Sequence, residues 1–200
     1  MMKWLQNENL LRGAYFHSTK FWQHMQIKKE KSSRRSTKFD AVIAWKYARK
    51  FCNGHTKQCF NEIRLHFFPL NIYTDHWVLF IVSFDDKLVY SIDSLGGTHE
   101  QHYDIMKVFL MLVLSNRDDG GIDKERNAWN HKPLSVPGNC RQRDSFNCGI
   151  FVILYTIIIA NDPSLLQDIA SMSSTWISHT NLNLWRGFIF EVIVSLSQGV

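Results

Sequence analysis

The sequence predicts an α+β domain, because strand-length apolar runs occupy the middle of the chain and helical patterns flank them on both sides. The chain has 200 residues, of which 45% are hydrophobic and 14% aromatic. This is the composition of a globular protein, and the length suffices for one domain with a buried core. We therefore expect a single domain over residues 1–200.

The first quarter of the chain predicts helices. Over residues 4–26 apolar side chains recur at steps of three and four, which favours short helices. A further helix is predicted over residues 39–51, with Asp40 as a candidate N-cap.

A basic segment at residues 28–38 separates these two stretches. Six basic residues stand there against Glu30, a net charge of +5 that equals the net charge of the whole chain. The rest of the chain is therefore neutral, and the basicity is a local property. Contact with nucleic acid, a nuclear targeting signal and an acidic partner all remain open, but we favour a solvated loop and expect no nucleic-acid binding.

The middle of the chain predicts a sheet. Residues 64–70 and the continuous apolar run 77–84 read as strands, the latter buried on both faces. Residues 85–87 form a turn, and residues 88–92 return as the hairpin partner. With so short a turn, we expect residues near 76–77 to lie opposite residues near 92–93, which places Asp93 within reach of His76.

The remainder predicts three helices, and its polar stretch 116–130 predicts a loop. The apolar run Ile150–Ala160 is too short to cross a membrane and predicts a buried helix. The expected elements are a helix at 101–115, a short strand at 134–136, a helix beginning at Cys148 and a last helix at 181–198.

The four cysteines suggest free thiols in a reducing compartment, the nucleus or the cytoplasm. None belongs to a Cys-x-x-Cys pair, and the first residues turn polar at once, unlike a signal peptide. Cys52, His55 and Cys59 form only a loose cluster without a second ligand pair. We therefore expect no metal and no cofactor.

Cys148 is the candidate nucleophile. It follows a polar turn and opens an apolar helix, so the positive end of the helix dipole stabilises its thiolate. A small buried core residue is the alternative interpretation.

Three further residues complete the set of groups that a cysteine hydrolase needs. His76 precedes a rigid strand and suits a general base, and Asp93 follows the partner strand and suits an orienting carboxylate. Gln142, six residues before the thiol, suits an oxyanion donor beside the backbone N–H of Cys148.

The order of these motifs resembles the Ulp1/SENP family of ubiquitin-like-protein proteases. The motifs are His76-Trp77, Asp93-Ser94-Leu95-Gly96-Gly97, Gln142 and Cys148-Gly149, and the opening Trp4-Leu5-Gln6-Asn7 also looks like a family element. The resemblance implies a papain-like cysteine protease fold in a circularly rearranged order, with a central mixed sheet packed by helices.

The resemblance also implies roles. Cys148 would attack the carbonyl at the Gly-Gly end of a SUMO-like or other ubiquitin-like modifier, with His76 as base and then acid. Asp93 would orient His76, and Gln142 would line the oxyanion hole. Trp4 and Trp77 would wall a narrow tunnel for Gly-Gly, with Asn7 contacting the substrate backbone. A monomer that does not bind membranes is expected.

Some residues depart from the family pattern and mark a divergent member. Asn7 stands where the family usually has Asp, and Asp144 and Asn147 exchange the usual Asn and Asp. Three other functions remain open: a polyprotein-processing protease or an acyltransferase of the same fold, and a modifier-binding module without turnover.

Overall fold

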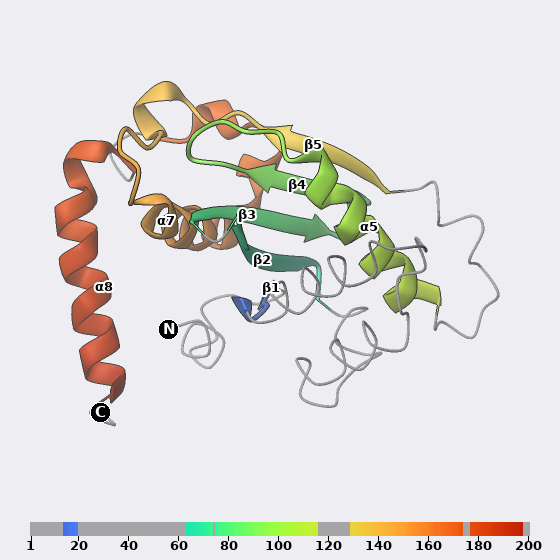
Figure 1. Ribbon diagram of the computed structural model, residues 1–200, viewed down its shortest axis with the longest axis horizontal. Coiled ribbons are helices and arrows are strands. Elements are labelled where there is room, and N and C mark those ends of the chain that lie inside the picture. The colour runs from blue at the N-terminus through green and yellow to red at the C-terminus, as the bar shows by residue number, and fades with distance from the viewer. Residues whose placement is uncertain (1–13, 20–62, 74, 116–128, 174–176, 198–200) are drawn as a thin grey trace.

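The structure is a computed structural model that describes residues 14–19, 63–73, 75–115, 129–173 and 177–197. Within these ranges lies a five-stranded mixed sheet with the strand order β1-β2-β3-β4-β5 (Figure 1). The inner strands β2, β3 and β4 are antiparallel, whereas β1 and β5 join the two edges in parallel. The strands are β1 (Ala14–Phe16), β2 (Leu65–Ile72), β3 (His76–Ser83), β4 (Leu88–Ile92) and β5 (Asn130–Leu134).

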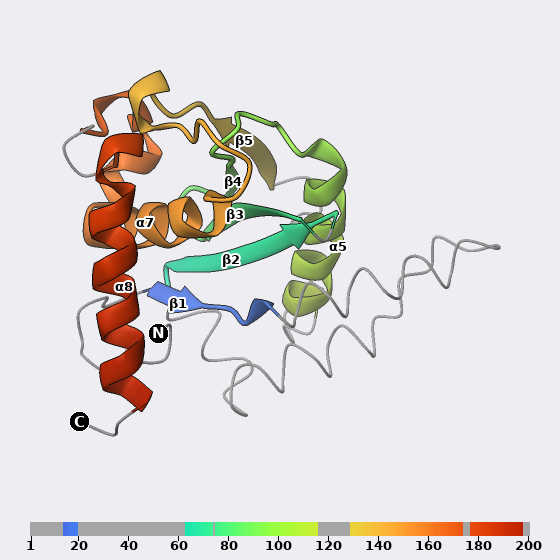
Figure 2. The ribbon, with the colours of Figure 1, turned by 60° about the vertical axis from the view of Figure 1, so that its left-hand side comes forward.

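Helices cover both faces of this sheet. In Figure 2, α5 lies on one side of the strands and α7 on the other, with α8 beyond α7. Short 3-10 turns connect the later elements. The helices are α5 (Glu100–Ser115), α7 (Cys148–Asn161) and α8 (Leu182–Ser197), and the turns are η1 (Gly138–Cys140), η2 (Pro163–Leu166), η3 (Ile169–Ser171) and η4 (His179–Asn181). No helix among the described residues is long and apolar enough to cross a membrane.

Successive side chains of a strand point to opposite faces of the sheet, so β2 and β3 contribute residues to the packing on both faces. Phe67 and Ile81 are register partners and belong to the main core together with Phe151 of α7. Their neighbours Phe68 and Phe80 are also partners and face the side of α5, where Phe68 meets Phe109 edge to face. Both faces of β3 are thus buried, which explains its uninterrupted apolar run.

Most predicted elements are confirmed. The strands predicted at 64–70, 77–84 and 88–92 correspond to β2, β3 and β4. The helices predicted at 101–115, from Cys148 and at 181–198 correspond to α5, α7 and α8. These segments carry a strong apolar pattern of their own.

Two predictions of secondary structure are wrong. Residues 14–16 form the edge strand β1 and not part of a short helix, because they pair with β2 from Leu65 to Phe67. The strand expected at 134–136 runs instead from Asn130 to Leu134, where it pairs with β4. Both strands are set by pairing with a distant segment, which local periodicity does not record.

The hairpin register also differs from the prediction. Leu79, two residues beyond Trp77, is opposite Ile92, so residues 76–77 do not directly face residues 92–93. Several predicted features lie outside the described residues. These are Trp4, Asn7, the basic segment 28–38, the helix at 39–51, Cys52, His55 and Cys59.

Candidate active site

His76 and Asp93 are in direct contact. His76 is the first residue of β3, Asp93 follows the last residue of β4, and His76 Nε2 lies 2.7 Å from Asp93 Oδ1. Their side chains are 16% and 4% exposed. The end of the sheet therefore holds a histidine and a carboxylate in a fixed pair.

The observed register still allows this contact. Leu79 pairs with Ile92, so continuing the ladder by one residue would place Val78 opposite Asp93. His76 lies two residues from Val78 on the same face of the strand, and diagonal neighbours of this kind lie within reach of long side chains. His76 thus meets Asp93 diagonally and not directly across the hairpin.

Asp93 accepts four hydrogen bonds. Oδ1 receives His76 Nε2 and the backbone N–H of Leu95 at 2.8 Å, and Oδ2 receives the N–H of Gly97 at 2.9 Å and His99 Nε2 at 2.7 Å. Burial acts to raise the pKa of Asp93, but the hydrogen bonds, with that of His99 the largest, outweigh it and lower the pKa from 3.8 to about 2. Asp93 is therefore a carboxylate.

Since an ionised carboxylate only accepts hydrogen bonds, both imidazoles donate to it from Nε2. Neutral His76 then carries its proton on Nε2 and a lone pair on Nδ1. This tautomer leaves Nδ1 as the ring nitrogen that can take a proton from a thiol.

His99 is a member of the site that the sequence did not reveal. It is one of nine histidines, and the Gly96-Gly97 pair before it is typical of an ordinary loop. The only signal in the sequence was its closeness to Asp93, six residues away.

Cys148 is the first residue of α7 and is 4% exposed. Its Sγ lies 4.0 Å from the carbonyl oxygen of Asp75, the residue directly before His76. Asn147 at the N-cap makes no capping hydrogen bond through its side chain. The first N–H groups of α7 and the helix dipole are therefore available to stabilise a thiolate.

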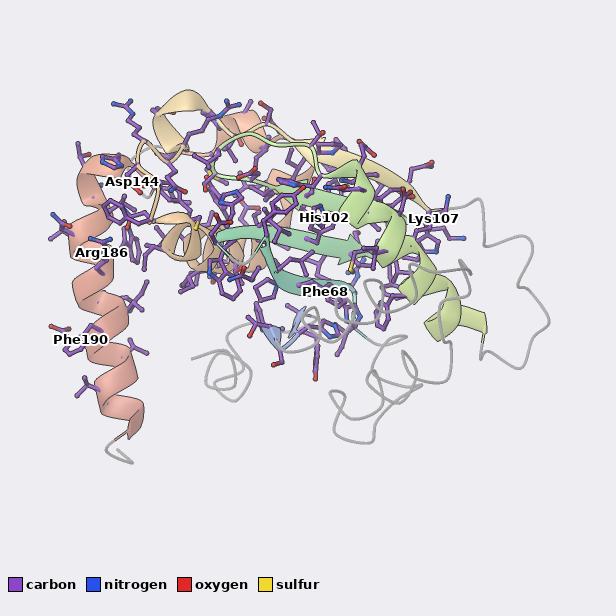
Figure 3. All side chains as sticks on the ribbon, viewed as in Figure 1. Phe68, His102, Lys107, Asp144, Arg186 and Phe190 are labelled. Atoms are coloured by element: carbon purple, nitrogen blue, oxygen red, sulfur yellow. The ribbon has the colours of Figure 1, made fainter. Side chains whose placement is uncertain are left out.

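Asp144 shapes the turn that leads into Cys148. Its Oδ1 accepts the backbone N–H groups of Phe146 at 3.0 Å and Asn147 at 2.8 Å, and its Oδ2 accepts Asn147 Nδ2 at 2.5 Å. Burial favours a higher pKa, but these bonds and nearby His179 lower the pKa of Asp144. Figure 3 shows Asp144 beside the start of α8. The exchanged Asp and Asn thus bind each other and hold the turn.

Gln142 lies between the two halves of the site. Its Oε1 accepts Ser94 Oγ at 2.7 Å, and its Nε2 donates to the backbone oxygen of Asp144 at 2.6 Å and to Asp144 Oδ1 at 3.2 Å. Gln142 is 6% exposed. The amide therefore connects the loop after Asp93 to the turn before Cys148.

Trp77 lies against the helix that carries the thiol. An added Cβ at Gly149 would lie 3.6 Å from Trp77 Cδ1, an ordinary van der Waals contact. Successive residues of β3 thus point to opposite faces, His76 toward Asp93 and Trp77 toward α7. The other predicted substrate contacts, Trp4 and Asn7, lie outside the described residues.

One group of side chains in the described part of the chain has the donor set of a metal site. His76, Asp93 and His99 offer ligand atoms within 4.8 Å of one another. Both imidazole nitrogens carry the protons that a metal would have to displace. The expectation of no resident metal therefore stays a prediction.

The chain was compared with curated protein sequences, with solved structures and with protein families. No curated protein sequence matches the chain. Among solved structures, a de-sumoylating protease matches with a TM-score of 0.71 and 17% identity, over 99% of this chain and 76% of that chain. The Chaetomium thermophilum Ulp1-like SUMO protease catalytic domain matches with a TM-score of 0.59 and 18% identity, over 88% and 62%.

A third match is the Ulp1 protease domain in complex with Smt3, the yeast ortholog of SUMO. Its TM-score is 0.55 and its identity 18%, over 81% of this chain and 62% of that chain. The chain thus spans less than two thirds of the Ulp1 chains that it matches. These structures share its α+β fold. The model of the Ulp1 protease family, C-terminal catalytic domain, matches residues 1–181, and the chain belongs to that family.

Proposed function

We propose that this protein is a cysteine peptidase that cleaves after the Gly-Gly end of a ubiquitin-like modifier, in a precursor or in a conjugate. The observation that carries the proposal is the arrangement at one end of the sheet. His76 Nε2 bonds to buried Asp93, and the Cys148 sulfur lies at a helix N-terminus against the residue before His76.

The proposed chemistry gives each group a defined role. His76 Nδ1 takes the proton of the Cys148 thiol, and the sulfur attacks the carbonyl carbon of the second glycine. A C–S bond forms, the C–N bond breaks, and His76 returns the proton to the departing amine. Water then hydrolyses the thioester and restores the thiol. Asp93 stabilises the imidazolium throughout these steps.

Gln142 is proposed to bind the oxyanion with the backbone N–H of Cys148. Its Nε2 makes a short bond to the Asp144 carbonyl oxygen and a longer one, 3.2 Å, to the Asp144 carboxylate. The N–H of the longer bond is the one that can turn to the oxyanion. The short bond would keep the amide in place during this change.

The finer assignments are part of the same proposal. We favour a SUMO-like modifier, because the matched structures are described as SUMO and de-sumoylating proteases. We propose a monomer in the nucleus or cytoplasm, where a reducing environment keeps the Cys148 thiol active.

The test is covalent labelling with modifier probes that carry a propargylamide after Gly-Gly. We expect the SUMO probe to add its mass to the wild-type protein faster than the NEDD8 or ubiquitin probes. Cys148→Ala is expected to abolish labelling and to lower kcat on a fluorogenic SUMO substrate by about 10³-fold or more. Modifier binding without labelling would instead support an idle binding module.

Cys140→Ala is the matched control. Cys140 is the other free thiol of the described residues, and it is fully buried with its Sγ 3.7 Å from the Met172 carbonyl oxygen. Burial raises the pKa of Cys140, so it should not react. Full labelling of Cys148→Ala, or loss of labelling in a folded Cys140→Ala, would contradict the assignment of the nucleophile.

A further inference from the structure

Asp93 lies between two histidines that it binds in the same way. His76 Nε2 is 2.7 Å from Oδ1 and His99 Nε2 is 2.7 Å from Oδ2, and the ring centroids are 6.4 Å apart. The His99 side chain is 11% exposed. The proposed mechanism uses the first histidine and leaves the second without a role.

His99 holds its place in an unfavourable backbone conformation. Its φ is 59°, in the left-handed region, which costs a residue with a Cβ about 1 kcal/mol. Its carbonyl oxygen accepts the N–H groups of His102 and Tyr103 and so begins α5. Glycine or asparagine would serve this helix start with less strain, so the backbone alone does not explain a histidine.

The loop is compact around the contact of His99 with Asp93. An added Cβ at Gly97 would lie 2.6 Å from both Asp93 Oδ2 and His99 Nε2. The Gly97 N–H also donates to the same oxygen. The chain thus approaches the carboxylate and the His99 ring at a point where a side chain would displace one of them.

We propose that His99 is a positioning residue of the active site: it holds Oδ2 of Asp93 so that Oδ1 points at His76 Nε2. A carboxylate bound on both oxygens has one orientation, and that orientation fixes the tautomer of His76 that leaves Nδ1 for the thiol. This inference rests on the proposed function for its chemistry. It adds a residue that acts through Asp93 and does not touch the substrate.

The experiment compares three substitutions at position 99. His99→Phe keeps a ring and removes the donor, His99→Gly removes both the donor and the strain, and His99→Gln keeps an N–H at similar reach. We expect kcat to fall about 10- to 100-fold in the first two with little change in KM, a range typical of outer partners that orient a histidine. His99→Gln should recover most of the lost kcat.

A second measurement does not depend on the substrate. The rate of Cys148 alkylation by iodoacetamide as a function of pH reports the thiolate paired with the His76 imidazolium. Without His99 only the Gly97 N–H holds Oδ2, so Asp93 is held less firmly and supports the imidazolium less. The alkaline limb of the profile should therefore move to lower pH in His99→Phe and His99→Gly. His99→Gln should keep the wild-type profile.

His131→Phe is the matched control. His131 Nδ1 donates to Glu100 Oε2 near the start of α5, its Nε2 lies 2.8 Å from Ser91 Oγ, and its ring stacks on Tyr103. The four hydrogen bonds of Asp93 do not include one from His131. The same substitution there should leave kcat and the alkylation profile unchanged. Thermal unfolding of every variant separates folding from positioning, and His99→Gly covers the case in which His99→Phe does not fold.

The outcomes are distinct. Wild-type kcat and alkylation in folded His99→Phe and His99→Gly would show that His99 only begins a helix and would overturn the proposal. If no modifier is cleaved but alkylation changes as expected, the substrate assignment fails and the role of His99 stands. A wild-type Cys148 that alkylates like an ordinary thiol would overturn both.

Discussion

Two pairs of histidines lie on the same face of the sheet, and only one of them has a carboxylate between its rings. His17 Nε2 and His66 Nδ1 are 3.2 Å apart, the residues are 2% and 1% exposed, and the ring of His17 stacks on Phe68 with centroids 3.8 Å apart. His76 and His99 each bind Asp93 instead. The first pair is packed like aromatic side chains, whereas the second binds an ionised carboxylate.

The electrostatics of the two pairs differ accordingly. Burial, and then the charge of His66, lower the pKa of His17 well below 6.5, and burial lowers the pKa of His66 to about 3. These rings stay neutral at any ordinary pH. At the other pair Asp93 is ionised, with a pKa of about 2, and stabilises an imidazolium. The carboxylate, and not the number of histidines, makes the difference.

The largest expected effect comes from the same substitution in both pairs. His76→Phe should lower kcat/KM on a Gly-Gly substrate by about 10³-fold or more, because it removes the base. His66→Phe should keep kcat/KM and change the free energy of unfolding by about 1 to 2 kcal/mol, as expected for a substitution of similar shape in a core. Cleavage assays and denaturant unfolding of both variants give the comparison.

Two results would break this contrast. An active His76→Phe would remove His76 from the mechanism, and an inactive but folded His66→Phe would show that the buried pair affects the chemistry.

The next effect is on stability in acid. His66 takes up a proton near pH 6.5 when unfolded but only near pH 3 when folded, so between these values the unfolded state binds more protons. Stability is therefore full above about pH 6.5 and falls as the pH falls toward 3, by about 2 kcal/mol from His66 alone at pH 5. His17 adds to the loss in the same direction.

Denaturant unfolding at pH 8 and pH 5 measures this difference. Wild type should lose more free energy of unfolding between the two pH values than His66→Phe does, because the variant lacks the titrating ring. Equal losses in the two proteins would mean that the buried pair does not control acid stability.

The smallest expected effect is that of a chelator. The nitrogens of His76 and His99 that face Asp93 already hold protons, so EDTA should leave kcat/KM of the purified protein unchanged. A loss of activity in EDTA that Zn²⁺ restores would turn this histidine pair into a metal site.

The sequence predicted what local pattern and motif order encode. β3, α5, α7 and α8 have apolar patterns of their own, and His76, Asp93 and Cys148 stand at element ends where an apolar pattern begins or stops. The chain order of these residues carried the resemblance to the protease family.

The rest depends on contacts between distant segments. β1 and β5 exist because β2 and β4 offer edges for pairing, and the diagonal contact of His76 with Asp93 depends on a register that the turn residues alone did not reveal. His99 was missed for a similar reason, since its role comes from a left-handed backbone and the fold of a Gly-Gly loop.

The close packing around Gly97 bears on how active and inactive homologues are told apart from their sequences. A single methyl group at this position would collide with both the carboxylate and the second imidazole, 2.6 Å from each. A relative with another residue there can keep His76, Asp93, Gln142 and Cys148, but Asp93 or His99 has to shift. The shift would act on the Asp93 carboxylate that binds His76, so residue 97 should be compared together with the catalytic residues when activity is inferred from sequence.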